Sequence, residues 1–198
     1  MQPLSIAPSS SPRPEAHATT RYVTAGGVHV ERHTLPLSLS EARAALEAIA
    51  TALDTQPGVL LGSSFEYPGR YSRYDIGLVN PPLRITCSGE RVELTALNAR
   101  GTALLQILSP VVSATAVLCD VHVTDDVVRA RVRPAATPES EEERSRSASV
   151  FDLLRDLVAH LGHAGDSLLG LYGAFGYGLG FRFEPVRAQL PQPLGARD

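Results

Sequence analysis

The stretch LLGSSFEYPGRYSRYD, residues 60–75, is the part of the sequence that decides the expected fold and function. Together with Val59, the residues Leu60 and Leu61 predict a buried strand, which ends abruptly at the small polar run Gly62, Ser63 and Ser64. A loop follows that mixes charged residues with aromatic ones: Glu66, Arg70, Arg73 and Asp75 among Phe65, Tyr67, Tyr71 and Tyr74. Hydroxyl, guanidinium and aromatic groups gathered at a strand end suit a small zwitterion, because Arg binds a carboxylate bidentately. The alternative is an ordinary charged loop with tyrosines packed at the domain rim.

Upstream of this stretch, the pattern predicts a hairpin and then a helix. The segment RYVTAGGVHVERHTL, residues 21–35, alternates around Ala25-Gly26-Gly27, where glycines supply the positive φ of a tight turn. Ser38 and Glu41 have the spacing of a capping box, and apolar residues recur at helical intervals until Pro57-Gly58. Those apolar positions are Ala42, Leu46, Ile49 and Leu53.

Downstream, two further hairpins and two helices are expected. Residues 83–96 alternate about Gly89, and VLCDVHV and VVRARVR flank the turn Thr124-Asp125-Asp126. A short helix from about Asn98 separates them, and a second helix is predicted near 148–162, before a glycine-punctuated strand run in 171–185. Hairpins separated by helices indicate an α+β fold with antiparallel sheets and flanking helices rather than a doubly wound parallel sheet.

The sequence divides into a tail and one domain. Residues 1–20 are rich in Pro and Ser without periodicity and are expected to be a disordered tail. Residues 21–198 form the domain, in which the polar stretch 134–149 is predicted to be an exposed loop because it cannot bury a face.

Composition excludes several functional classes. A net charge of −3 over 198 residues offers little attraction for a phosphate backbone, so no nucleic-acid partner is expected. No apolar run approaches the ~18–20 residues of a membrane span, so no membrane partner is expected. The two cysteines, Cys87 and Cys119, lie in apolar strand-like runs and are predicted to be reduced, buried thiols of a cytoplasmic protein.

Four patterns resemble catalytic, metal-binding or phosphate-binding motifs, but each has a simpler explanation. Gly176, Gly178 and Gly180 lack the spacing and following helix of a phosphate loop, and adjacent Asp125 and Asp126 fit turn chemistry. The pair His160 and His163 shares a helical face without a third ligand, so exposed surface histidines are expected. The acidic run Glu139 and Glu141 to Glu143 reads as solvated linker. No catalytic or metal-binding residue is therefore assigned.

The segment EYPGRYSRYDIG, residues 66–77, resembles the N-terminal region of anthranilate synthase component I, particularly the class fused to its glutamine amidotransferase. The resemblance continues through LRITCSGERVELTALNARG at 83–101 and LYGAFGYGLGFRFEP at 171–185, and covers most of residues 21–195. In that family a strand ending LLES, or LLSSS in the fused class, lines a tryptophan pocket, and it matches Leu60 to Ser63 here. This chain departs at Gly62, where stand-alone enzymes have Glu, and at Gly178, where the family usually has Asp.

The resemblance implies a fold, a reaction and partners. Anthranilate synthase makes anthranilate and pyruvate from chorismate with ammonia from glutamine or solution. Its two facing antiparallel sheets interleave N- and C-terminal segments, and this chain corresponds to the N-terminal part. Family members continue for several hundred residues into a chorismate-binding core that holds Mg, so this fragment is expected to be inactive alone and to carry no cofactor itself. The core and the glutamine amidotransferase domain are the implied protein partners.

The resemblance also implies a feedback site for L-tryptophan. Ser63 is expected to take the polar head of the amino acid, with the backbone of Gly62, Ser63 and Ser64 beside it. Arg73 matches a position where relatives carry a basic pocket residue, and Arg70 is a rival for that role. Two alternatives stay open: the same region of an aminodeoxychorismate or phenazine-pathway synthase, and a free-standing, non-enzymatic amino-acid-binding module.

Overall fold

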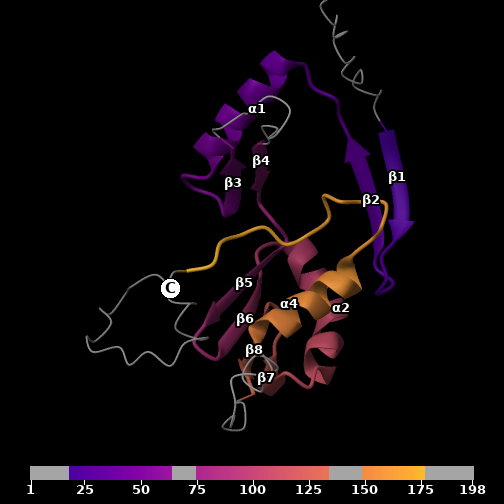
Figure 1. Cartoon of the computed structure of the whole chain (residues 1–198), viewed down its shortest axis with the longest axis vertical. Coiled ribbons are helices and arrows are strands. Elements are labelled where there is room, and N and C mark those ends of the chain that lie inside the picture. The colour runs from indigo at the N-terminus through magenta and orange to yellow at the C-terminus, as the bar shows by residue number, and fades with distance from the viewer. Residues whose placement is uncertain (1–17, 64–74, 134–148, 177–198) are drawn as a thin grey trace, which may run out of the picture.

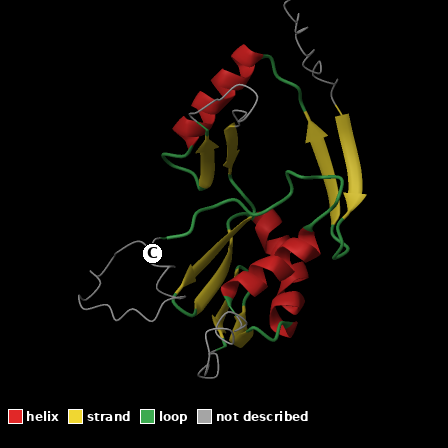
Figure 2. Cartoon of the chain, viewed as in Figure 1, coloured by secondary structure: helices red, strands yellow, loops and turns green. Residues whose placement is uncertain are grey.

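Every strand pairing in the described part of the chain is antiparallel. A computed structural model describes residues 18–63, 75–133 and 149–176, with the remaining stretches outside the description (Figure 1). In chain order the elements are β1 (Ala18–Val23), β2 (His29–Thr34), α1 (Leu39–Ala52), β3 (Gly58–Gly62), β4 (Asp75–Val79), β5 (Leu83–Ser88), β6 (Arg91–Ala96), α2 (Ala99–Ala114), β7 (Leu118–Val123), β8 (Val127–Val132) and α4 (Val150–Leu161). The α+β class expected from the sequence is confirmed (Figure 2).

The core lies between a four-stranded sheet and two helices. The strands run in the order β5-β6-β8-β7, and α2 and α4 lie alongside this sheet (Figure 1). Alternate residues of β6 and β8 are buried, while their neighbours Glu93 and Arg129 pair on the outer face at 2.8 Å. The buried apolar set is Val92, Leu94, Leu105, Leu108, Val112, Leu118, Val128, Ala130, Val132, Leu153 and Leu157. Both hairpins predicted for residues 83–96 and 117–133 are thereby confirmed.

Helix α2 is longer than the short helix that the sequence predicts. It begins at Asn98, whose side-chain oxygen accepts from the N–H groups of Arg100 and Gly101, and it continues for 16 residues. Pro110 lies inside it and cannot donate to the Gln106 carbonyl four residues earlier, which accepts instead from the Ser109 hydroxyl at 3.4 Å. Burial of Leu105, Leu108 and Val112 at about 1.5–3 kcal/mol each offsets the cost of about 3 kcal/mol for an interior proline.

Helix α1 covers a separate two-stranded sheet, β3-β4 (Figure 1). The predicted capping box is present: Glu41 N–H donates to the Ser38 hydroxyl, and Ser38 N–H donates to the Glu41 carboxylate at 2.7 Å. Ile49 packs directly over Gly77 of β4, where an added Cβ would lie only 3.0 Å from the Ile49 side chain. No α1 residue is fully buried, so this unit contributes much less apolar burial than the four-stranded sheet.

The predicted β1-β2 hairpin forms and docks on the C-terminal end of α4. Its turn donates two backbone hydrogen bonds, from Ala25 to the Gly162 carbonyl at 3.1 Å and from Gly26 to the His160 carbonyl at 2.7 Å. Carbonyls at a helix C-terminus lack partners within the helix, so the turn satisfies groups that water would otherwise solvate. Gly26 is required for this approach, because a Cβ there would clash with the His160 ring.

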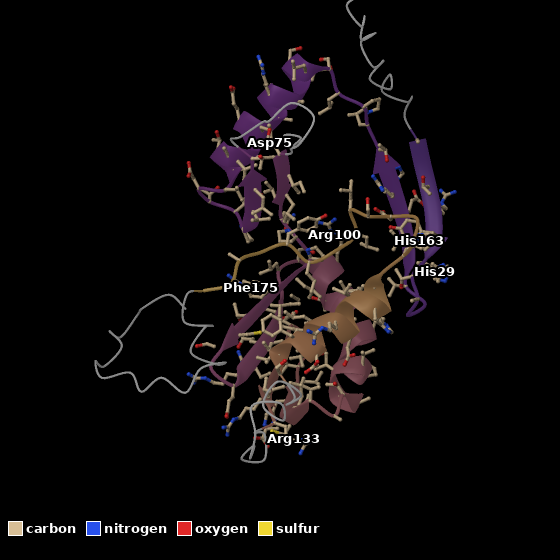
Figure 3. All side chains as sticks on the ribbon, in the orientation of Figure 1. His29, Asp75, Arg100, Arg133, His163 and Phe175 are labelled. Atoms are coloured by element: carbon tan, nitrogen blue, oxygen red, sulfur yellow. The ribbon has the colours of Figure 1, made fainter. Side chains whose placement is uncertain are left out.

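A buried carboxylate completes this docking. Asp166, only 6% exposed, accepts from the Arg32 guanidinium at 2.8 Å, the Tyr22 hydroxyl at 2.6 Å and the Leu168 N–H at 3.0 Å. The Tyr22 ring also stacks on His163 with centroids 4.2 Å apart, near the labelled position of His163 in Figure 3. The Tyr22 hydroxyl, then the Leu168 N–H and the Arg32 charge, hold the pKa of Asp166 below its usual value despite burial, which opposes them.

The structure corrects several local expectations. His160 and His163 are half-buried against the β1-β2 hairpin rather than exposed. Cys87 is exposed and Cys119 half-buried, although both thiols are free as expected. Residues 171–176 form no strand, and the remainder of that predicted strand run lies outside the described residues. Strand β1 begins at Ala18, inside the stretch assigned to the tail, and residues 134–148 of the predicted loop are outside the description.

Replacing Asp166 tests the docking of the hairpin. We expect Asp166→Ala to lower the free energy of unfolding by about 2–3 kcal/mol, because Arg32 and Tyr22 lose a shared, buried acceptor. Asp166→Asn keeps the size and one acceptor oxygen, so its effect should be smaller. Urea-induced unfolding at neutral pH measures the change, with Asp125→Ala in an exposed turn as the control.

The stability that Asp166 contributes should also depend on pH in a defined direction. Because the folded pKa of Asp166 is depressed, its ionised form contributes stability above the unfolded value of ~3.9, and this is lost as pH falls through the folded value. The difference between wild type and Asp166→Asn should therefore shrink in acid. A difference that stays constant from neutral pH to below pH 3 contradicts the assigned role.

Candidate functional site

The candidate site lies where strand β3 ends and strand β4 begins. The antiparallel register runs from Gly58 opposite Val79 to Gly62 opposite Asp75, so the last residue of β3 pairs with the first residue of β4. This end of the small sheet points away from the four-stranded sheet, because β4 leads from its other end into β5 (Figure 1). The abrupt polar change at Gly62 and Ser63 therefore coincides with a true strand end, as the sequence predicts.

Two of the five predicted ligand-binding residues are described by the structure. Gly62 is exposed at the end of β3, and Ser63 follows it and is half-buried. The other three, Ser64, Arg70 and Arg73, lie outside the described residues, so their place relative to Ser63 stays a prediction.

The strand that carries this site is less buried than the sequence predicts. Leu60 is 37% exposed and Leu61 is 42% exposed, where a buried strand was expected. Successive residues of a strand face opposite sides, and among the described elements α1 covers one face of this two-stranded sheet (Figure 1). An apolar run thus indicated a strand correctly but not its burial.

Asp75 is a site residue that the sequence argument did not select. Its Oδ1 atom lies 3.3 Å from the position that a Cβ on Gly62 would occupy, which places the carboxylate directly beside the backbone of the β3 end. Figure 3 labels Asp75 at the start of β4, next to α1. Residues 62 and 75 come together only through the pairing register of β3 and β4. The sequence feature that could have indicated this contact is the pair of short apolar runs that form these two strands.

The other polar patterns in the sequence do not form a second site. Asp126 accepts from the Thr102 hydroxyl at 3.0 Å and its carbonyl accepts from the Ala96 N–H, which is a structural role in a turn. Within the described ranges, no three His, Cys, Asp or Glu side chains come together as a metal site. The acidic run at residues 139–143 and the glycines Gly178 and Gly180 lie outside those ranges.

A shallow depression between the hairpin turn, α2 and α4 is a weaker candidate. Its main carboxylate, Asp156, already accepts from the Thr115 hydroxyl at 3.2 Å. Small residues form most of its wall, which comprises Ala25, Gly26, Val111, Ala114, Thr115, Asp156, Ala159 and His160. Two of its three polar side chains, Thr115 and Asp156, are thus bonded to each other.

Among the described helices, none has the length and apolar character needed to span a membrane.

Comparison with known proteins identifies close relatives of one kind. The chain is 39% identical over 186 residues to an anthranilate synthase of Azospirillum brasilense, covering 93% of this chain and 25% of that protein. It is 35% identical over 130 residues to anthranilate synthase component 1 of Vibrio cholerae, covering 64% of this chain and 24% of that protein. The pyocyanine-specific anthranilate synthase component 1 of Pseudomonas aeruginosa is 32% identical over 134 residues, with 65% and 24% covered.

These similarities confirm the resemblance stated from the sequence. The chain spans about a quarter of the length of the curated relatives it matches. No protein-family model and no solved structure matches it.

Proposed function

Since the chain is a relative of anthranilate synthase component I, we propose that it is the N-terminal, tryptophan-sensing part of such an enzyme. The full protein would be a cytoplasmic lyase that converts chorismate and glutamine or ammonia into anthranilate and pyruvate in tryptophan biosynthesis. The observation that carries the proposal is the 39% identity to an anthranilate synthase across 186 residues.

Within this proposal, the chain regulates and does not catalyse. Chorismate and Mg belong to the C-terminal core of the full-length enzyme, and glutamine is handled by a fused amidotransferase domain. The chain itself is assigned no cofactor and no catalytic residue. Its contribution is a wall of the tryptophan pocket at the β3 end, which Gly62 and Ser63 begin.

Ser63 is the described residue best placed to bind the polar head of tryptophan. A hydroxyl both donates and accepts, so it can contact either end of an amino-acid zwitterion. The half-burial of Ser63 beside the exposed Gly62 gives a ligand access to both. Ser64, Arg73 and its rival Arg70 complete the proposed pocket from positions outside the described residues.

Inhibition requires that tryptophan distinguish two arrangements of the enzyme. A ligand shifts an equilibrium only by its difference in affinity for the two states. Tryptophan bound at the β3 end would favour the arrangement that is not competent for chorismate, and by linkage chorismate would weaken tryptophan binding.

The activity of the complete gene product tests the proposed reaction. With chorismate, Mg and either glutamine or ammonia, we expect anthranilate, followed by its fluorescence, and an equal amount of pyruvate. Omission of chorismate is the control. Formation of aminodeoxychorismate, or of another aminated product that keeps the enolpyruvyl group so that no pyruvate is released, would contradict the assignment and favour a related synthase.

A bulky side chain at residue 63 tests the proposed feedback site. In the full-length enzyme, Ser63→Phe should relieve inhibition by tryptophan, raising the half-inhibitory concentration at least about tenfold, which corresponds to 1.4 kcal/mol of lost affinity. Ser113→Phe, the same substitution at an exposed position of α2, should leave inhibition unchanged. Inhibition of Ser63→Phe at wild-type tryptophan concentrations counts against the site.

The isolated 198-residue chain should bind tryptophan only weakly. In the proposed pocket the opposite wall comes from the C-terminal core, and loss of half the contacts of a small ligand removes several kcal/mol at 1.4 kcal/mol per tenfold. We expect a dissociation constant above about 1 mM by calorimetric titration. Saturable micromolar binding by a monodisperse monomer would show that the pocket is complete within this chain.

A further inference from the structure

The link between β4 and β5, Asn80-Pro81-Pro82, is bound to the start of α2. Asn98 Nδ2 donates to the side-chain oxygen of Asn80 at 2.8 Å and to the Pro81 carbonyl at 3.1 Å. The Leu97 N–H donates to the Pro82 carbonyl at 2.9 Å. The contacts of residues 80–82 with residues 97–101 are called the joint below, and they fix the link on the first turn of α2.

Asn98 has two roles in the joint, and they use different atoms. Its Oδ1 accepts from the N–H groups of Arg100 and Gly101 and so caps α2, while its Nδ2 holds the link. The Arg100 guanidinium, labelled in Figure 3, donates to the Asn80 carbonyl at 3.0 Å. The packing is tight, because a Cβ on Gly101 would clash with the Pro82 carbonyl. A substitution that removes only the amide donor of Asn98 therefore separates the link from the cap.

Asn80 has a backbone conformation that these contacts hold. Its φ is 53°, in the left-handed region, and it precedes a proline, which favours extended conformations for the preceding residue. Asn tolerates the left-handed region better than most residues, but the conformation is still strained. The Asn80 N–H donates to the carbonyl of Pro57, the residue before β3, at 2.9 Å. Asn80 is thus bonded both to the start of β3 and to the start of α2.

Strand β4 connects the joint to the candidate site. It runs from Asp75, paired with Gly62 at the β3 end, to Val79, which precedes Asn80. Figure 1 shows α1, β3 and β4 as a small unit set apart from the four-stranded sheet, with the link leading from one to the other. Because β3 and β4 pair along their whole length, a ligand that shifts the β3 end also shifts β4 and the link.

We propose that the joint transmits effector binding from the β3 end to α2, with Asn98 as the positioning residue. Rigid elements and hydrogen-bond networks carry energetic coupling, and the joint gives the link a single conformation, so the small unit and α2 move together. Without the Asn98 donor, Asn80 would relax and the link would become a flexible connection. The inference rests on the proposed function, because it takes tryptophan as the effector, and it adds how that site regulates the enzyme.

Asn98→Asp in the full-length enzyme tests the transmission. Asp keeps an oxygen that caps α2 about as well as Asn does, and it removes the donor to the link. The coupling factor is the KM for chorismate at saturating tryptophan divided by the KM without tryptophan. We expect it to fall at least about fivefold. Tryptophan affinity by calorimetric titration should stay within about threefold of wild type, and kcat without tryptophan within about twofold.

Three further variants separate coupling from charge and from folding. Asn98→Ser also keeps a capping oxygen and removes the amide donor, but it adds no charge, so it should lower the coupling factor as Asn98→Asp does. Gln106→Glu makes the same amide-to-acid exchange at an exposed position of α2 and should leave the coupling factor unchanged. Asn80→Gly keeps the left-handed backbone and removes one acceptor, so it should lower the coupling factor less than Asn98→Asp.

The outcomes distinguish this inference from the proposed function. If Ser63→Phe relieves inhibition while Asn98→Asp and Asn98→Ser keep the wild-type coupling factor, the site stands and the role of the joint is wrong. If both Asn98 variants lose tryptophan affinity and basal activity together, Asn98 serves only the fold, which also overturns the inference. If tryptophan does not inhibit the wild-type enzyme, the proposed function fails first and this inference fails with it.

Discussion

Burial of one face of the four-stranded sheet beneath α2 and α4 is the constraint on which the rest of the structure depends. The eleven residues of this core come from strands and helices spread between Val92 and Leu157, and each large aliphatic side chain contributes about 1.5–3 kcal/mol. Core packing places the C-terminal end of α4, and the β1-β2 hairpin can dock there only because those carbonyls are presented to its turn. It also explains why α2 continues through Pro110, since shortening the helix would leave Val112 unpacked.

Two aspartates show how differently this fold places its carboxylates. Asp166 is buried and accepts from Arg32, Tyr22 and Leu168, so its charge is compensated within the chain and its pKa is lowered. Asp75 is exposed at a strand end, with its carboxylate beside the backbone of Gly62. A buried carboxylate that accepts from three protein donors stabilises the fold, because its partners replace the water that burial removes.

The three sheets of the described residues differ in how much apolar surface they bury. The four-stranded sheet has its own core, whereas α1 covers only one face of the β3-β4 sheet (Figure 2). In that small sheet Leu60 and Leu61 stay partly exposed. A unit with little apolar burial of its own has a low cost of local rearrangement, which is the property that a switching site needs. That property suits the regulatory role proposed for the β3 end.

Local patterns in the sequence were sufficient for the element types: the alternation in residues 83–96 and 117–133, the Ser38–Glu41 cap and the helix near 148–162 all correspond to observed elements. They also located the polar strand end at Gly62 and Ser63, and the motifs identified the family. Contacts between distant segments could not be read in this way, because nothing local to Tyr22 or Arg32 refers to Asp166, and nothing at Gly62 refers to Asp75. Burial likewise depends on what covers a face, which is why Leu60 and Leu61 are exposed and His160 is not. The sequence by itself thus determined the elements and the family. Tertiary packing decided the hydrogen bonds of Tyr22 and Arg32 to Asp166, and strand register placed the Asp75 carboxylate beside Gly62. Packing and register depend on all the packed segments at once, so no local pattern specifies them.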